Sequence, residues 1–85
     1  MANYKVEIKK SAQKEIENLP SVILKKIVAK IQTLSSEPRP NGSKKLTSDE
    51  KYRLRVGDYR ILYSIEDDKL IIFVVKVGHR KSVYQ

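Results

Sequence analysis

The stretch that decides the fold alternates cationic and apolar residues on both sides of a Gly-Asp pair: Lys51-Tyr52-Arg53-Leu54-Arg55-Val56-Gly57-Asp58-Tyr59-Arg60-Ile61-Leu62-Tyr63. Successive side chains of a β-strand point to opposite faces of a sheet, so each half of the stretch has an apolar face and a face that carries its arginines. The Gly-Asp pair stands where a two-residue hairpin needs a residue with positive φ. The stretch therefore predicts two antiparallel strands joined by a tight turn.

The segment from Leu70 to Gly78 is apolar on both faces until Lys76, a pattern typical of a strand buried at the centre of a sheet. A polar turn over residues 66–69 joins it to the preceding strand, which predicts a three-stranded antiparallel meander. Its core face is predicted to comprise Ile71, Phe73, Val75 and Val77. Its other face is predicted to comprise Leu70, Ile72, Val74 and Lys76.

The N-terminal half is predicted to be a scaffold of one strand and two helices. Residues 4–9 alternate apolar and charged side chains, as a strand with one buried face does. Ser11 is the expected N-cap of a first helix that ends at Pro20, and Ser21 the expected N-cap of a second. The lysines of the second helix are expected to face solvent. Residues 35–50, rich in Ser, Pro, Asn and Gly, are predicted to be a connector.

The order strand, helix, helix, strand, strand, strand predicts a single α+β domain over residues 1–85. The N-terminal strand joins the meander in one sheet, and the helical hairpin packs on one face of that sheet. We call the other face, which the helices do not cover, the open face.

Composition limits the classes of function. The 85 residues include 18 Lys and Arg against 10 Asp and Glu, a net charge of +8, which favours a nucleic-acid or acidic protein partner without distinguishing them. There is no cysteine, so disulfides and thiolate metal sites are excluded, and with one histidine a zinc site of the usual kind is not expected. No stretch reaches the ~18 apolar residues of a membrane span, and no signal peptide is apparent. We expect a cytoplasmic protein without membrane partners.

The open face is predicted to gather the cations of the last 35 residues, which are Lys51, Arg53, Arg55, Arg60, Lys76 and Arg80. Each arginine alone could be a solvated surface charge. Because all of them share one face, we interpret this face as a binding surface for a polyanion.

An apolar strip is predicted on the same face, made of Leu62, Leu70, Ile72 and Val74. Contiguous exposed apolar patches tend to mark interaction sites, so a partner protein is expected to cover the strip. The alternative is that residues 35–50 or the C-terminal tail fold over it.

The run around Tyr52 to Tyr63, with the ending Val77-Gly78-His79-Arg80-Lys81-Ser82-Val83-Tyr84, resembles the RelE/ParE superfamily of bacterial and archaeal toxins. The resemblance covers the whole chain in element order and is most specific over residues 45–84, where the ending resembles the RelE branch. It implies a type II toxin that cuts messenger RNA in the ribosomal A site without a metal or cofactor. In that family the RNA 2′-hydroxyl attacks the adjacent phosphate, leaving a cyclic phosphate and a free 5′-hydroxyl.

The resemblance also implies catalytic roles for individual residues. Arg60 matches the arginine that binds the scissile phosphate, and Arg80 the one that contacts phosphate and assists the leaving oxygen. Tyr84 matches a tyrosine that stacks on a base. Arg53 and Arg55 stand where the RelE branch has two lysines, one of them proposed as the general base.

An arginine accepts a proton poorly, so Arg53 and Arg55 are expected to hold phosphate rather than act as a base. Tyr84 and His79 remain as candidate proton acceptors, since an imidazole exchanges a proton near neutral pH. Strict alternation would turn His79 towards the core as a structural residue, but Gly78 permits a bend. Further RNA contacts are expected from Lys51, Arg53, Lys76 and Lys81.

The implied partner is a small acidic antitoxin of the RelB type, expected to contact Leu62, Ile72 and Val74. Other implied partners are the ribosome with its messenger RNA and, through the antitoxin alone, operator DNA. Two alternatives stay open: a ParE-like inhibitor of DNA gyrase, and an inactive homologue that only binds antitoxin.

Overall fold

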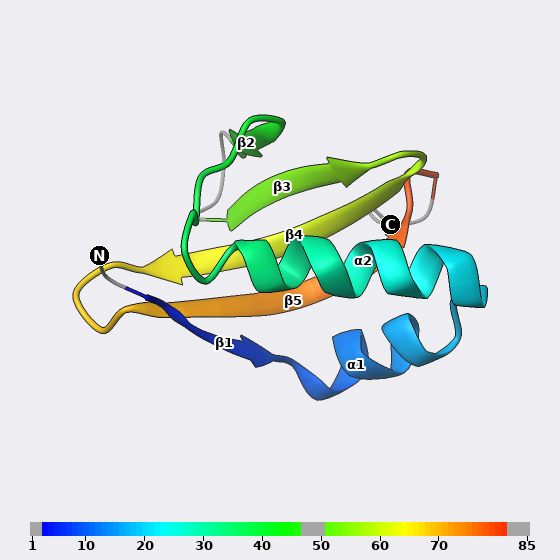
Figure 1. Cartoon of the computed structure of the whole chain (residues 1–85), viewed down its shortest axis with the longest axis horizontal. Coiled ribbons are helices and arrows are strands. Elements are labelled where there is room, and N and C mark those ends of the chain that lie inside the picture. The colour runs from blue at the N-terminus through cyan, green and yellow to red at the C-terminus, as the bar shows by residue number, and fades with distance from the viewer. Residues whose placement is uncertain (1–2, 47–50, 82–85) are drawn as a thin grey trace.

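The computed structural model describes residues 3–46 and 51–81. Its elements in chain order are β1 (Lys5–Ile8), α1 (Lys10–Glu17), α2 (Ser21–Thr33), β2 (Ser43–Lys45), β3 (Lys51–Val56), β4 (Tyr59–Glu66) and β5 (Ile71–His79). The strands form one sheet in the order β1-β5-β4-β3-β2, with both helices on one face (Figure 1). The predicted α+β class is confirmed. No helix in the described part of the chain is long and apolar enough to cross a bilayer.

The sheet is mixed, because β1 pairs in parallel with β5 while β3, β4 and β5 form the predicted antiparallel meander. The N-terminal strand and the last strand, far apart in sequence, therefore lie side by side. Two details differ from prediction. The connector contains the short strand β2, which pairs with β3, and the middle position belongs to β4 rather than to β5.

Both predicted helix caps are displaced by one or two residues. Ser11 lies inside α1, whose N-cap is Lys9, and Ser21 is the first residue of α2, whose N-cap is Pro20. Neither N-cap side chain forms a capping hydrogen bond. The apolar spacing rather than a cap therefore sets where these helices lie, since each buries residues three or four apart against the sheet.

The core lies between the helices and one face of the meander. Its fully buried members from the sheet are Leu54, Ile61, Tyr63, Ile72, Val74 and Val77. Full burial of one such side chain contributes about 1.5–3 kcal/mol to the free energy of unfolding. Because the same strands carry the arginines at the intervening positions, packing this core fixes the orientation of the opposite face.

The predicted faces of β5 are wrong before the bulge: Ile72 and Val74 are 0% exposed and belong to the core, whereas Phe73, predicted for the core face, pairs with Ser64 on the open face. Leu62 pairs with Lys76 but Tyr63 pairs with Val74, so β5 has one extra residue at this point, a β-bulge. The bulge reverses the alternation, so residues 72, 74 and 77 all face the helices.

The apolar strip predicted on the open face is therefore not formed. Ile72 and Val74, which were expected to contact an antitoxin, are fully buried and have no exposed surface for a partner to contact. Leu70 is 39% exposed and lies in the turn before β5 with a φ of 55°. Leu62 does lie on the open face, but it is only 8% exposed.

A polar cluster joins the segment after α2 to the sheet at the end where β1 begins. Arg39 donates through Nη2 to Asp67 Oδ2 at 2.9 Å and through Nε to the Tyr52 hydroxyl at 3.0 Å. The Tyr4 hydroxyl donates to Asp67 Oδ1 at 2.7 Å. These hydrogen bonds, that of Arg39 first, lower the pKa of Asp67. One carboxylate thus connects Tyr4, the residue before β1, with the β4–β5 turn and the segment after α2.

Paired substitutions in β5 test the bulge. Ile72→Ala removes a fully buried side chain and is expected to reduce the free energy of unfolding by about 2–5 kcal/mol. Ile71→Ala, at the partly exposed neighbouring position, should cost clearly less. Urea denaturation of both variants measures the difference. Equal losses, or a larger loss at Ile71, would contradict the described faces of β5.

The Asp67 cluster predicts a specific dependence of stability on pH. An aspartate with a pKa lower in the folded than in the unfolded chain stabilises the fold above about pH 4, and this contribution is lost as the pH falls through the folded value. Asp67→Asn should therefore lower the melting temperature at pH 7, by a small amount because the pair is exposed. The difference from the unsubstituted chain should close as the pH falls from 4 to 2. A difference that persists unchanged at pH 2 would show that the carboxylate charge is not involved.

Candidate functional site

The open face carries its cations in rows that cross the strands. One row is Arg55, Arg60 and Gly78, the next is Arg53, Leu62 and Lys76, and the third is Lys51, Ser64 and Phe73. Lys44 of β2 extends the middle row, because it pairs with Arg53. The predicted placement of the cations of β3, β4 and β5 on this face is confirmed. Leu62 is buried here without a covering helix, consistent with the aliphatic stems of Arg53 and Lys76 lying beside it.

Arg55 and Arg60 stand directly opposite each other on neighbouring strands. The Cα atoms of such antiparallel partners are about 5 Å apart. Like charges in this arrangement destabilise a sheet unless an anion lies between or beside them. Gly78 completes the row and adds no side chain to it. Repulsion between the two guanidinium groups therefore destabilises the free chain, and a bound anion would reduce this repulsion.

Arg60 is held by the turn of its own hairpin. Its Nη1 donates to the carbonyl oxygens of Gly57 at 3.3 Å and Tyr59 at 3.1 Å. Gly57 has a φ of 60°, as the predicted hairpin requires. The side chain is 8% exposed, so Arg60 lies under the surface rather than projecting from it. Its guanidinium is thereby fixed in position before any ligand arrives.

Arg80 reaches the same turn through its backbone, since its N–H donates to the carbonyl oxygen of Asp58 at 2.8 Å. The end of β5 accordingly lies beside the β3–β4 turn (Figure 1). We call the group of Arg55, Arg60 and Arg80 the arginine corner. Arg55 and Arg80 are exposed. Within residues 3–46 and 51–81, none of the three forms an ion pair with a carboxylate.

His79 lies on the helix side of the sheet, where strict alternation predicts it, and not beside Arg60. It pairs with Tyr59, and the two rings meet edge to face with centroids 5.5 Å apart. Its Nδ1 accepts a hydrogen bond from the N–H of Lys81 at 3.2 Å. As an acceptor in this bond, Nδ1 carries no proton. The imidazole thus helps to fix the turn that carries Arg80.

The remaining predicted residues are divided between the described and undescribed parts of the chain. Lys51, Arg53 and Lys76 are half-buried on the open face, and Lys81 is exposed immediately after Arg80. Tyr84 lies outside the described residues. Sequence reasoning missed the carbonyl oxygens of Gly57, Asp58 and Tyr59, which hold Arg60 and the Arg80 backbone. The Gly-Asp signal revealed the turn but not these contacts.

Comparison with known proteins agrees with the arrangement of the sheet and helices. The profile of a family described as the ParE toxin of type II toxin–antitoxin system, parDE, matches residues 6–84. The chain belongs to the RelE/ParE toxin superfamily. Among curated relatives, a putative toxin RelE1 of Methanocaldococcus jannaschii is 37% identical over 86 aligned positions, covering 96% of each chain.

Two further relatives place the chain in the RelE family of type II toxins. The mRNA interferase toxin RelE of Escherichia coli is 29% identical over 80 positions, which cover 92% of this chain and 84% of that protein. A chain in the crystal structure of the toxin–antitoxin complex RelBE2 from Mycobacterium tuberculosis superposes with a TM-score of 0.83 at 31% identity, covering 94% of both chains. The fold of this chain is therefore that of solved RelE toxins.

Proposed function

We propose that this toxin is an endoribonuclease that cuts messenger RNA at the ribosomal A site, in the cytoplasm, by attack of the RNA 2′-hydroxyl on the adjacent phosphate. The observation that carries the proposal is the arginine corner, where two exposed arginines flank a third that the β3–β4 turn holds in place. The E. coli relative named mRNA interferase supports the same activity.

The chemistry requires positive charge where the phosphate gains negative charge. Attack by the 2′-oxygen forms a bond to phosphorus and gives a dianionic transition state. The bond from phosphorus to the 5′-oxygen then breaks, leaving a cyclic phosphate and, after that oxygen takes up a proton, a 5′-hydroxyl. Donors fixed beforehand stabilise such a state without a cost of reorganisation. In the proposed site Arg60 is the fixed donor, and Arg55 and Arg80 close on the phosphate from the exposed side.

The reaction also requires a group that accepts the proton of the 2′-hydroxyl. Arg53 and Arg55 are poor acceptors because a guanidinium releases its proton only far above neutral pH. In this proposal His79 positions the turn that carries Arg80 and does not act as the base. Its Nδ1 already accepts a hydrogen bond from the Lys81 N–H, and its ring lies against Tyr59. Of the two candidates that the sequence indicated, Tyr84 remains.

The proposed partner that silences the toxin is an acidic antitoxin of the RelB type, through which the pair would bind operator DNA. The relative of known structure that is described as a toxin–antitoxin complex supports this partner. The net charge of +8 gives an acidic protein a favourable long-range attraction to the chain.

A ParE-like gyrase inhibitor is the second candidate, because the matching family profile is described by the ParE name. Accumulation of gyrase-linked DNA breaks with intact messenger RNA after induction would favour it. Absence of both lesions would favour a homologue that only binds antitoxin.

Arg80→Ala tests the proposed reaction. The substitution keeps the backbone bond to Asp58 and removes one exposed guanidinium, so stability should change by less than about 1 kcal/mol. Cleavage should fall about 100-fold or more, as for loss of one transition-state donor. Primer extension on translated message after induction measures the breaks. Lys69→Ala, an exposed cation at the other end of the sheet, is the matched control and should cut normally. Unimpaired cleavage by the Arg80 variant would refute its role.

His79 variants separate positioning from proton transfer. Asparagine can accept a hydrogen bond from the N–H two residues on but cannot act as a base at neutral pH. His79→Asn should therefore retain most of the cleavage rate, whereas His79→Ala should lose it, with no change in the shape of the pH–rate profile. An inactive His79→Asn variant, or loss of the acidic limb of the profile, would identify His79 as the base instead.

A further inference from the structure

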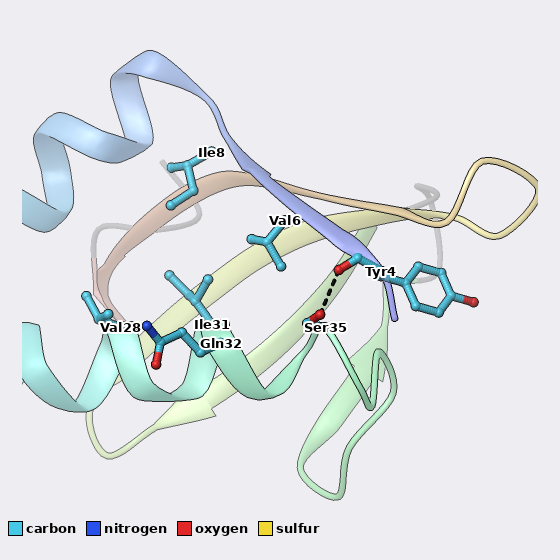
Figure 2. A pocket seen from close by; sticks show the side chains of 7 residues that line it. All are labelled: Tyr4, Val6, Ile8, Val28, Ile31, Gln32 and Ser35. Carbon is cyan, nitrogen blue, oxygen red and sulfur yellow. Dashed lines mark hydrogen bonds between the residues drawn. The ribbon is translucent and has the colours of Figure 1, made fainter. Parts of the chain in front are cut away.

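The half of β5 that leads to Arg80 extends beyond the strand that pairs with its first half. β1 pairs only with residues 71–74, and the Lys9 N–H donates to the Val74 carbonyl oxygen at 2.8 Å. Ile8 is the last residue of β1, and the chain passes from there into α1 (Figure 2). Residues 75–79 therefore have β4 on one side and no strand of the described chain on the other.

A side chain of α1 takes the place of a strand on this side. α1 lies beside this half of β5 (Figure 1), and Glu15 Oε1 accepts a hydrogen bond from the Val77 N–H at 3.0 Å. Val77 is 1% exposed and Glu15 is half-buried. A buried N–H without an acceptor is unfavourable, because it has lost its bond to water. The carboxylate of Glu15 therefore satisfies a backbone group that the sheet itself leaves unpaired.

The bond is made to Val77 because of the bulge in β5. The Val74 carbonyl group points to β1, and in a regular strand the backbone groups of residue 76 would point the same way. The extra residue at the bulge transfers this direction to Val77. The N–H groups of Lys76 and Gly78 then point to β4. Glu15 thus binds a group that only the bulged register presents to α1.

The Glu15 bond lies close to the arginine corner along the chain. Only Gly78 and His79 separate Val77 from Arg80. The Arg80 N–H donates to the Asp58 carbonyl oxygen at 2.8 Å, so hydrogen bonds hold the chain on both sides of this short segment. The Arg80 side chain is exposed, and its position depends on the backbone that carries it.

We propose that Glu15 is a positioning residue for the arginine corner: its carboxylate fixes the end of β5, and through it the Arg80 guanidinium that meets the scissile phosphate. The inference rests on the proposed function for the role of Arg80. Glu15 belongs to α1, which covers the face of the sheet opposite to the open face, so it acts through the backbone of β5 and not on the RNA. Strand ends open more easily than the core, so one bond has a large effect there.

Two substitutions of Glu15 separate the hydrogen bond from the negative charge. A carboxylate could also act by reducing the repulsion among the arginines. Glu15→Gln keeps an acceptor oxygen and removes the charge, whereas Glu15→Ala removes both. Alanine is as good a helix former as glutamate, so α1 is retained in Glu15→Ala. Glu17→Ala is the matched control, since it removes the same charge from an exposed position of the same helix.

Amide exchange followed by NMR measures the effect on the strand end. In Glu15→Ala the amides of Val77 and Arg80 should exchange about tenfold faster than in the unsubstituted chain, since a hydrogen bond of the strand end is lost. Glu15→Gln and Glu17→Ala should exchange at nearly the unsubstituted rates. The amide of Tyr63, a fully buried residue of β4, should not change in any variant and shows in the same spectra that the core is folded.

Cleavage should follow the same order as exchange. Primer extension on translated message after induction should show about tenfold fewer breaks for Glu15→Ala, because Arg80 is then held less often beside the phosphate. Glu15→Gln should restore cleavage, and Glu17→Ala should cut normally.

Each other outcome has a distinct meaning. Unchanged exchange at Arg80 in Glu15→Ala would overturn the proposal, because the carboxylate would then affect Val77 alone. Equal acceleration at Tyr63 would also overturn it, since this would indicate a general loss of stability. Loss of cleavage in Glu15→Gln would assign the effect to charge and not to position. Absence of breaks with the unsubstituted chain would instead overturn the proposed function, while the exchange rates still decide whether Glu15 fixes the end of β5.

Discussion

The extra residue that β5 carries opposite Leu62 and Tyr63 determines which side chains of the sheet become core and which become surface. It lets Ile72, Val74 and Val77 all pack beneath the helices, although they do not share one parity. It also brings Lys76 and Gly78 onto the open face, in the rows of Leu62 and Arg60. The register between β4 and β5 therefore determines both the packing of the core and the position of the cations on the open face. The arginine corner depends on this bulge, although the bulge lies outside it.

Repulsion between the positive charges of the arginine corner destabilises the folded chain, and the packing of the rest of the fold compensates for it. Arg55 and Arg60 face each other across two strands without a carboxylate partner in the described part of the chain. The carbonyl oxygens of the β3–β4 turn hold one guanidinium, and the backbone of Arg80 is bonded to the same turn. At the opposite end of the sheet, the cluster around Asp67 binds a cation to a carboxylate in the usual way. Among the described residues, the two ends therefore differ in whether their arginines have a carboxylate partner.

The alternation of residues 51–65 was sufficient to predict the hairpin, its apolar face and the side on which Arg53, Arg55 and Arg60 lie. It was not sufficient for β5, because a strand that is apolar on both faces does not reveal its phase, and a bulge leaves no mark in such a pattern. The predicted antitoxin contacts at Ile72 and Val74 failed for this reason. The parallel pairing of β1 and the short strand β2 depend on contacts between distant segments. So does the groove lined by Val6, Ile8, Val28 and Ile31 (Figure 2), which no local pattern indicates.

The claim that three guanidinium groups converge on one phosphodiester can be measured directly by following the arginine Nε–Hε signals by NMR. The ligand would be a short RNA with a 2′-O-methyl group at the attacking position, which can bind but not react. The signals of Arg55, Arg60 and Arg80 are expected to shift together with one saturation curve. They should remain still when that phosphate is replaced by an uncharged linkage. Independent curves for the three arginines, or shifts that do not need the phosphate, would contradict a shared site.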